Sequence, residues 1–276
     1  MQHQPLIASY AKDFPWLRHF LASFRIHATG FLPPVIVIPG SDVPEAEKTV
    51  SEAQSNAKIV VYDVPARLKT YWWADFMRAQ VAMMSGDIHC PEADVVWLWG
   101  SDCFITGPLN PSMHMVDGKP VMPFSTFEAL LRTGGKACWR NSTRVALGWD
   151  PDHEFMRRLP LLYPKAVFPG TRACVARSPR YETFEDKAFG IAATRIGFSE
   201  SNVMGAYAWR YLHDAYRWEC VDGDAYPSLA ERHPSQTIQF WSQGGLDLPC
   251  DRHHAYHGQT PRQVIQSFYD RQGVAI

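Results

Sequence analysis

The stretch that decides the fold runs from Asp94 to Leu109 and has the sequence DVVWLWGSDCFITGPL. Its apolar run, residues 95–99, is too short to span a membrane and has the length of a β-strand that is buried on both faces. The run ends at Gly100, Ser101 and Asp102. Ligands bind at the carboxyl ends of central strands in open α/β sheets, so an acid at this position predicts a ligand site.

Short apolar runs alternate with amphipathic segments over the first hundred residues. We predict strands at residues 6–9, 35–38, 59–62 and 95–99, and helices that begin at Asp13, at Asp42 and at residue 71. Asp42 and Glu45 form a predicted capping box for the second helix. This alternation predicts an α/β fold that is Rossmann-like, with a mostly parallel sheet, right-handed crossovers and helices on both faces. Neither a Gly-x-Gly-x-x-Gly fingerprint nor a phosphate-loop motif occurs in the sequence.

The second half has shorter elements and many Gly, Pro and aromatic breaks. Ser125 and Glu128 predict the start of a short helix, residues 150–158 are typical of a solvated helix start, and Ser199 begins a further helix. A late strand is predicted at residues 238–241, and a capping box predicts a terminal helix from Thr260. No linker or repeat interrupts the chain, so we expect residues 1–276 to form a single domain with halves 1–109 and 110–276.

Composition limits the class of partner. The formal net charge is -1, which gives no electrostatic case for a nucleic-acid or membrane surface. The six cysteines include no Cys-x-x-Cys pair, which favours reduced thiols. No signal peptide or long apolar run is visible, so we expect a cytoplasmic protein without membrane contact, in the host cytoplasm if the chain is viral.

Five segments together resemble the A-type (GT-A) glycosyltransferases, which use nucleotide-sugar donors. They are SYAKDFPWLRHFLASF, PPVIVIP, ADVVWLWGSDCFITGPL, GFSESNVMGAYAW and HHAYHG, in that order. The resemblance implies that residues 1–109 bind the nucleotide-sugar and residues 110–276 face the acceptor. It also implies a single Rossmann-like domain that moves a sugar from a donor, expected to be a UDP-sugar, to an acceptor hydroxyl.

The metal of such enzymes is held by Asp-x-Asp at the end of the fourth strand. The matching triplet here is Gly100-Ser101-Asp102, so the first acid is missing and Asp102 is the residue carried over. A hard cation, Mn²⁺ or Mg²⁺, held by carboxylate oxygen neutralises the charge that grows on a departing nucleoside diphosphate. The resemblance places a second ligand at a histidine near a glycine, and His257 is the best match, with His254 behind it.

The donor is expected at the first strand. Ser9, Tyr10 and Asp13 match the family's opening motif, where the end of the first strand supports the nucleotide. Tyr10 is the stacking candidate for the base, and Lys12 or Arg78 is expected to reach phosphate. Ser101 belongs to the same donor site as Asp102.

Glycosyl transfer with inversion needs a carboxylate that accepts the proton of the attacking hydroxyl. Glu200 is the candidate base, because Ser199-Glu200 resembles the start of the family's acceptor-side segment. An acid in the first turn of a helix is equally typical of ordinary helix stabilisation, and Asp150 and Asp152 are the alternatives.

Three other functions stay open. The acceptor of a glycosyltransferase can be a hydroxymethylated base in DNA of the bacteriophage type, and aromatic and basic residues of the second half suit a DNA groove: Trp139, Arg140, Arg144, Arg172, Arg177 and Arg180. The missing acid at Gly100 also suits a catalytically inactive nucleotide-sugar-binding module. A nucleotidyltransferase shares the Rossmann-like half and the acid-held metal.

Overall fold

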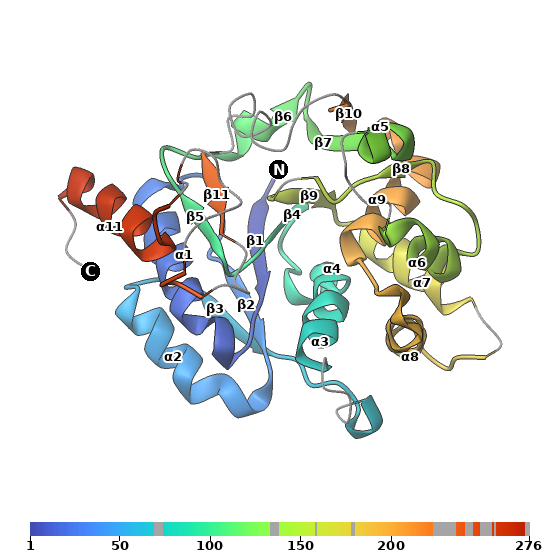
Figure 1. The fold of residues 1–276 in the computed structure, drawn as a ribbon, viewed down its shortest axis with the longest axis horizontal. Helices are drawn as coiled ribbons and strands as arrows, with labels where there is room; N and C mark the ends of the chain where they lie inside the picture. The colour runs from blue at the N-terminus through green and yellow to red at the C-terminus, as the bar shows by residue number, and fades with distance from the viewer. Residues whose placement is uncertain are drawn as a thin grey trace.

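The computed structural model describes residues 1–68, 74–132, 138–157, 159–177, 180–222, 236–240, 245–248, 256 and 258–273. Its centre is a five-stranded sheet in the order β3-β2-β1-β4-β9. The strands are β1 (His3–Ala8), β2 (Val35–Ile38), β3 (Lys58–Val61), β4 (Val95–Trp99) and β9 (Leu161–Pro164). The first four run parallel, and β9 runs antiparallel to β4. The predicted α/β fold with a mostly parallel sheet is confirmed (Figure 1).

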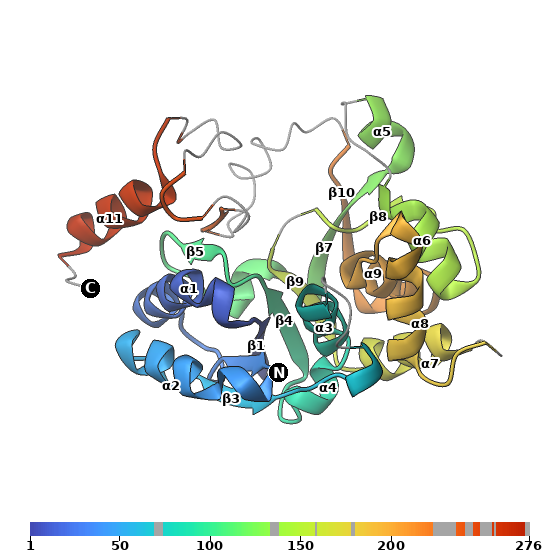
Figure 2. The ribbon, with the colours of Figure 1, turned by 60° about the horizontal axis from the view of Figure 1, so that its bottom comes forward.

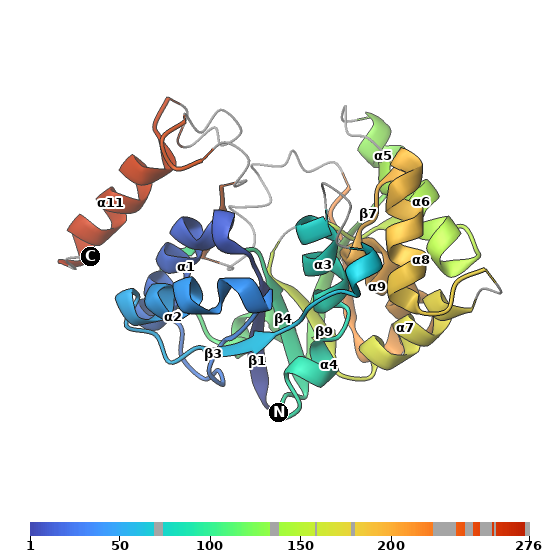
Figure 3. The ribbon, with the colours of Figure 1, turned by 90° about the horizontal axis from the view of Figure 1, so that it is seen from below.

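Alternate residues of the strands supply two separate cores, one on each face of the sheet. Ile7, Trp97 and Trp99 join the core beneath α1, whereas Leu6 and Leu98 join the core on the opposite face. Each residue of β4 is buried, which explains its continuous apolar sequence. The sheet therefore has helices on both faces, as Figure 3 shows.

The helices of the two faces are distinct sets. One face is covered by α1 (Phe14–His27), α2 (Val43–Glu52) and α11 (Pro261–Gln272). The other is covered by α3 (Ala74–Met83), α4 (Gly86–His89), α6 (Cys138–Leu147), α7 (Val167–Ala176), α8 (Phe184–Ile191) and α9 (Glu200–Tyr211). Figure 2 shows α11 at one end of the molecule and the α6–α9 group at the other.

Two smaller sheets lie outside the central one. β7 (Lys119–Thr126) pairs with β10 (Arg217–Cys220), β6 (Met115–Val116) and β8 (His153–Glu154), and β5 (Cys103–Ile105) pairs with β11 (Thr237–Gln239). The remaining elements are α5 (Phe127–Arg132) and the short turns η1 (Ala11–Asp13), η2 (Gly40–Asp42), η3 (Ala66–Leu68), η4 (Pro111–His114), η5 (Ala192–Ile196) and η6 (His213–Ala215). No helix among the described residues is both long and apolar enough to cross a bilayer.

Two predicted capping boxes are wrong. Asp42 stands at the N-cap of α2, but its carboxylate makes no capping bond and instead accepts a hydrogen bond from the backbone N–H of Ala11 at 2.8 Å. Ser125 lies in β7, and Thr126 provides the cap of α5, because its Oγ1 accepts from the N–H of Ala129 at 3.1 Å. The capping box at Thr260 is confirmed.

Residues 150–158 were predicted as a solvated helix start, and this interpretation is also wrong. His153 and Glu154 form strand β8, which pairs with the end of β7. Strand β9 follows after a short connection and was not predicted, because its four residues end in Pro164 and follow Pro160. The helix predicted from Ser199 is confirmed, and the side chain of Ser199 accepts from the N–H of Asn202 at 3.3 Å.

Candidate functional site

A candidate ligand site lies where the strand order reverses. β1 is the middle strand, with β2 and β3 on one side and β4 on the other. Ser9 and Tyr10 follow β1, and Ser101 and Asp102 follow β4, so these residues meet at the carboxyl edge of two adjacent parallel strands. Such a reversal is where open α/β sheets bind ligands.

Arg78 reaches this edge from α3. It is only 2% exposed, and its Nη2 donates a hydrogen bond to the backbone oxygen of Ser9 at 2.5 Å. Its Nε and Nη1 are buried and find no hydrogen-bond partner among the described residues, and the same holds for the hydroxyl of Ser9. Burial lowers the pKa of the guanidinium, and the charges of Asp75, Asp42 and Asp63 oppose that shift. Buried donors without partners cost free energy, so these groups point to an acceptor-rich ligand.

Two carboxylates share the same edge. Asp13 and Asp102 are each 8% exposed. Burial, together with the negative charge of Asp102, raises the pKa of Asp13 to about 6, and hydroxyl groups of Ser101 and Tyr10 donate hydrogen bonds to Asp13. Burial also raises the pKa of Tyr10 to about 12. The structure thus brings the predicted donor-site residues into one cluster with a cation on one side and an acidic pair on the other.

The acidic pair suits a hard divalent cation only in part. Carboxylate oxygens are the ligands that Mg²⁺ and Mn²⁺ prefer, and phosphate oxygens and water commonly complete their coordination. Within the described residues, no group of three His, Cys, Asp or Glu side chains is placed to hold a metal. Asp102 and Asp13 supply carboxylate oxygens at this edge of the sheet. The predicted ligands His254 and His257 lie outside the described residues.

Glu200 is buried at the start of α9 rather than open to solvent. It is 5% exposed, its carboxylate accepts a hydrogen bond from Ser201 Oγ at 2.7 Å, and burial raises its pKa. Its backbone N–H donates to Gln80 Oε1 at 3.0 Å. Gln80 lies two residues after Arg78 on α3, so this hydrogen bond links the start of α9 to the helix that carries Arg78.

The alternative bases lie on the connection between α6 and β8. Asp150 is exposed and paired with Arg140 through two hydrogen bonds of 3.1 and 2.6 Å, which lower its pKa. Asp152 is exposed in the same connection. Figure 1 shows α6 and β8 in the outer part of the second half, away from the ends of β1 and β4.

Two of the arginines predicted to suit DNA are engaged by carboxylates. Arg140 pairs with Asp150, and Arg172 binds both oxygens of Asp87 at 2.5 and 2.9 Å. The Arg172 side chain is 15% exposed and joins α7 to α4. Arg172 therefore links two helices, whereas the Arg140–Asp150 pair lies at the surface.

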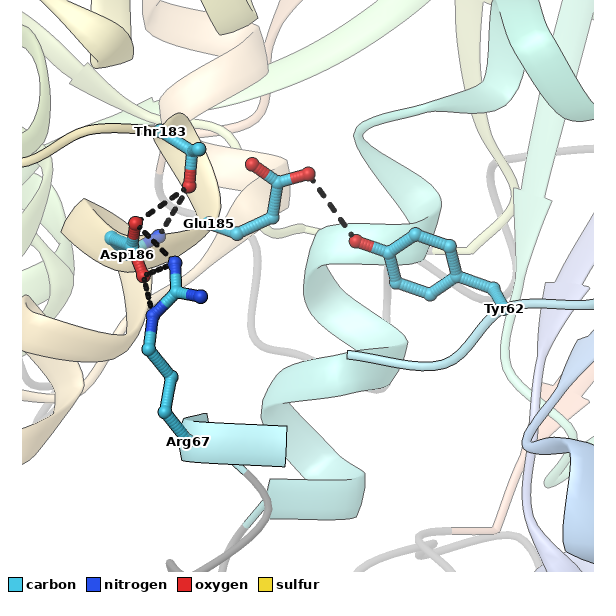
Figure 4. A network of polar contacts seen from close by, with 5 residues as sticks. All are labelled: Tyr62, Arg67, Thr183, Glu185 and Asp186. Atoms are coloured by element: carbon cyan, nitrogen blue, oxygen red, sulfur yellow. Dashed lines mark hydrogen bonds and ion pairs between the residues drawn. The ribbon is translucent and has the colours of Figure 1, made fainter. Parts of the chain in front are cut away.

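A polar network joins the connection after β3 to α8 (Figure 4). Tyr62 donates to Glu185 at 3.5 Å, and Arg67 donates to the two oxygens of Asp186 at 2.7 and 2.8 Å. Thr183 caps α8 and also donates to Asp186 at 3.1 Å. Because this connection leads into α3, the network helps to fix the helix of Arg78 against the second half.

The sequence interpretation missed a buried polar group around β8. Asn202 of α9 donates to Glu154 Oε1 at 2.9 Å, and Arg157 lies 3.6 Å from the same oxygen. Burial raises the pKa of Glu154, and the bonds from Asn202 and Arg157 oppose that shift. No local pattern marks the bond between Glu154 and Asn202, since these residues lie 48 positions apart on different elements.

Neither the models of known protein families nor the curated protein sequences compared with this chain match it.

Proposed function

We propose that the protein is an A-type glycosyltransferase that moves a sugar from a nucleoside-diphosphate sugar, expected to be a UDP-sugar, to an acceptor hydroxyl. The observation that carries the proposal is the buried guanidinium of Arg78, whose free N–H groups lie with the free Ser9 hydroxyl at the strand-order reversal. Phosphate oxygens are the acceptors that a guanidinium binds best. The parallel β3-β2-β1-β4 order agrees with the proposal.

The proposed roles follow from position. Arg78 and the Ser9 hydroxyl bind the diphosphate, and Tyr10 packs against the nucleotide base. Asp102 and Asp13 would hold Mn²⁺ or Mg²⁺, which would neutralise negative charge on the departing diphosphate. The base that takes the acceptor's proton is proposed to be Glu200, with Asp150 and Asp152 as the alternatives. An inverting enzyme needs this base within hydrogen-bond reach of the acceptor hydroxyl.

A thermal-shift panel tests the binding part. A ligand that binds only the folded state at a hundred times its Kd adds about 2.7 kcal/mol to the free energy of unfolding. We expect UDP and UDP-sugars to raise the Tm, with a larger rise when Mn²⁺ is present. Arg78→Gln should lose most of this rise, whereas the control Arg140→Gln, on the exposed face of α6, should keep it.

Product analysis tests the chemistry. A transferase releases UDP from a UDP-sugar, a nucleotidyltransferase releases pyrophosphate from a nucleoside triphosphate, and an inactive module releases neither. If the wild-type protein shows no Tm rise with any nucleoside diphosphate or nucleotide-sugar, the proposal fails at the binding step. If ligands bind and no UDP appears with saccharide or hydroxymethylated-DNA acceptors, the catalytic part fails.

A further inference from the structure

A pocket lies at the edge of the central sheet opposite to the edge that holds Ser9 and Asp102. It is about 230 Å³ in volume and is lined by the last turn of α1, the connection into β2 and the connection from α2 into β3. β2 and β3 begin at Val35 and Lys58, so the pocket borders the amino ends of these parallel strands. An engineered protein cavity of about 150 Å³ holds one benzene molecule. The pocket therefore has room for a fused pair of aromatic rings.

One wall of the pocket is aromatic and is fixed from behind. The rings of Phe24 and Phe31 both line it and lie 5.4 Å apart, with their planes at 60°. Phe31 also packs edge-on against Trp97 of β4 at a ring distance of 4.8 Å, and Trp97 is completely buried. Pro33 extends the apolar surface. A flat aromatic ligand packs well against such a wall, because aromatic rings prefer offset or edge-to-face contact with one another.

The rim of the pocket supplies three polar side chains, those of Arg25, Gln54 and Asn56. All three are exposed, and none of them makes a side-chain hydrogen bond or an ion pair with another residue that the structure describes. A carboxamide offers two N–H donors and one acceptor oxygen, and a guanidinium offers five donors in one plane. The rim therefore suits a planar ligand whose edge carries donors and acceptors side by side.

The charges around the pocket favour a neutral ligand. The guanidinium of Arg25 disfavours a cation. The helices α1 and α2 lie side by side (Figure 3), and their carboxyl ends both border the pocket. These ends carry negative partial charge, which disfavours an anion. A neutral ligand that hydrogen-bonds through both donors and acceptors meets neither cost.

We propose that this pocket binds the neutral purine base of a nucleoside of the adenosine type. The edge of adenine carries a donor and an acceptor side by side, and an Asn or Gln carboxamide pairs with both at once. The base packs against Phe24 and Phe31, and the planar guanidinium of Arg25 stacks on it. The inference goes beyond the proposed function and does not rest on it, because the pocket lies at the opposite edge of the sheet from Arg78.

Saturation-transfer difference NMR on the full chain tests the pocket, with adenosine, uridine and AMP as probes. We expect the protons of the adenine ring to receive more saturation than those of the ribose. Uridine should receive less than adenosine, because its single ring buries less apolar surface in the pocket. AMP should bind no more tightly than adenosine, since its phosphate meets the negative ends of two helices. Tighter binding of AMP, or equal saturation of uridine, would overturn the assignment to a neutral purine.

The double variant Gln54→Gly with Asn56→Ala removes both carboxamides and should weaken adenosine binding about tenfold, the cost of two lost hydrogen bonds. Gln54 has a φ of 51°, which glycine adopts freely, so its replacement leaves the fold intact, as circular dichroism and Tm establish. The control Asn141→Ala, which removes an exposed carboxamide of α6, should not change binding. No saturation of adenosine by the wild-type protein, or equal binding by the double variant, would overturn the proposal. Loss of binding in Tyr10→Ala but not in the double variant would overturn it too, because the nucleoside would then lie at the carboxyl edge.

Discussion

Gly205→Ala should destabilise the protein, although alanine is the better helix residue. Gly205 lies inside α9, where alanine gains about 1 kcal/mol over glycine. A Cβ at this position would lie 3.0 Å from Phe155 Cδ2 and closer still to Phe155 Cβ and Cγ. Phe155 is 1% exposed, and its Cβ is fixed to the backbone, so the ring cannot rotate away from the clash. Forcing an extra carbon into such a packed site costs about 1–3 kcal/mol, and the backbone must move, which places the cost at the upper end.

We therefore expect a net loss of about 1–2 kcal/mol in the free energy of unfolding. In a chain of this size that loss lowers Tm by about 2 °C for each kcal/mol. Urea unfolding followed by tryptophan fluorescence measures the free energy, and a thermal scan measures Tm.

Gly190→Ala is the matched control. Gly190 lies in α8, and its added Cβ would lie 2.6 Å from Tyr181 Cε1, at the far end of a partly exposed ring. That ring can turn aside, so the helix gain should prevail and Gly190→Ala should be neutral or stabilising. A Gly205→Ala variant as stable as wild type, or a Gly190→Ala variant that loses as much, would refute the packing argument.

Three further predictions concern stability. His19 is 7% exposed and burial lowers its pKa to about 4, so its neutral form is favoured in the folded state. The unfolded chain therefore binds more protons than the folded chain between pH 6.5 and 4, and the free energy of unfolding falls as pH falls through that window. His19→Leu removes this contribution. Urea unfolding at pH 7 and pH 5 should show that the difference in unfolding free energy between the two pH values is about 2 kcal/mol smaller in the variant. Asn202→Ala removes the hydrogen bonds of the Asn202 side chain to Glu154 Oε1 and to the buried N–H of Phe155, and should lower the free energy of unfolding by about 2–4 kcal/mol. The control Asn141→Ala, at an exposed position, should lower it by less than about 0.5 kcal/mol. Arg67→Gln removes an ion pair whose arginine side chain is 55% exposed, so we expect little change in the midpoint of urea unfolding; a large drop of that midpoint would show that the network of Figure 4 is structurally essential.

The cluster at the carboxyl edge of β1 and β4 was predictable because its residues follow the predicted strands. Parallel neighbours end at the same edge of a sheet, so the positions after β1 and β4, including Ser9 and Asp102, must come together once the strands pair. The apolar run of β4 contains enough information to place that strand. Arg78 was predictable as a phosphate candidate, but its burial and unused donors were not, since they depend on how α3 packs.

The buried polar group around β8 could not be predicted from local pattern. Glu154 has the residue type and neighbours of a solvated helix start, and only the return of the chain through α9 buries it. The failed cap at Asp42 has a similar origin. Its carboxylate lies at the N-cap position of α2 and could accept from the first turn of that helix. It accepts instead from the backbone N–H of Ala11, thirty-one positions earlier. Tertiary contacts of this range override local preferences.

Gly100 leaves room for the Asp102 carboxylate. A Cβ at position 100 would lie 2.5 Å from Asp102 Oδ1, so any side chain there forces the Asp102 carboxylate to rotate out of its place beside Asp13. Gly100→Asp would therefore add a carboxylate at the end of β4 while displacing that of Asp102. Positions 100 and 102 are therefore a coupled pair, and an engineer who wants a second carboxylate at the end of β4 has to redesign both together.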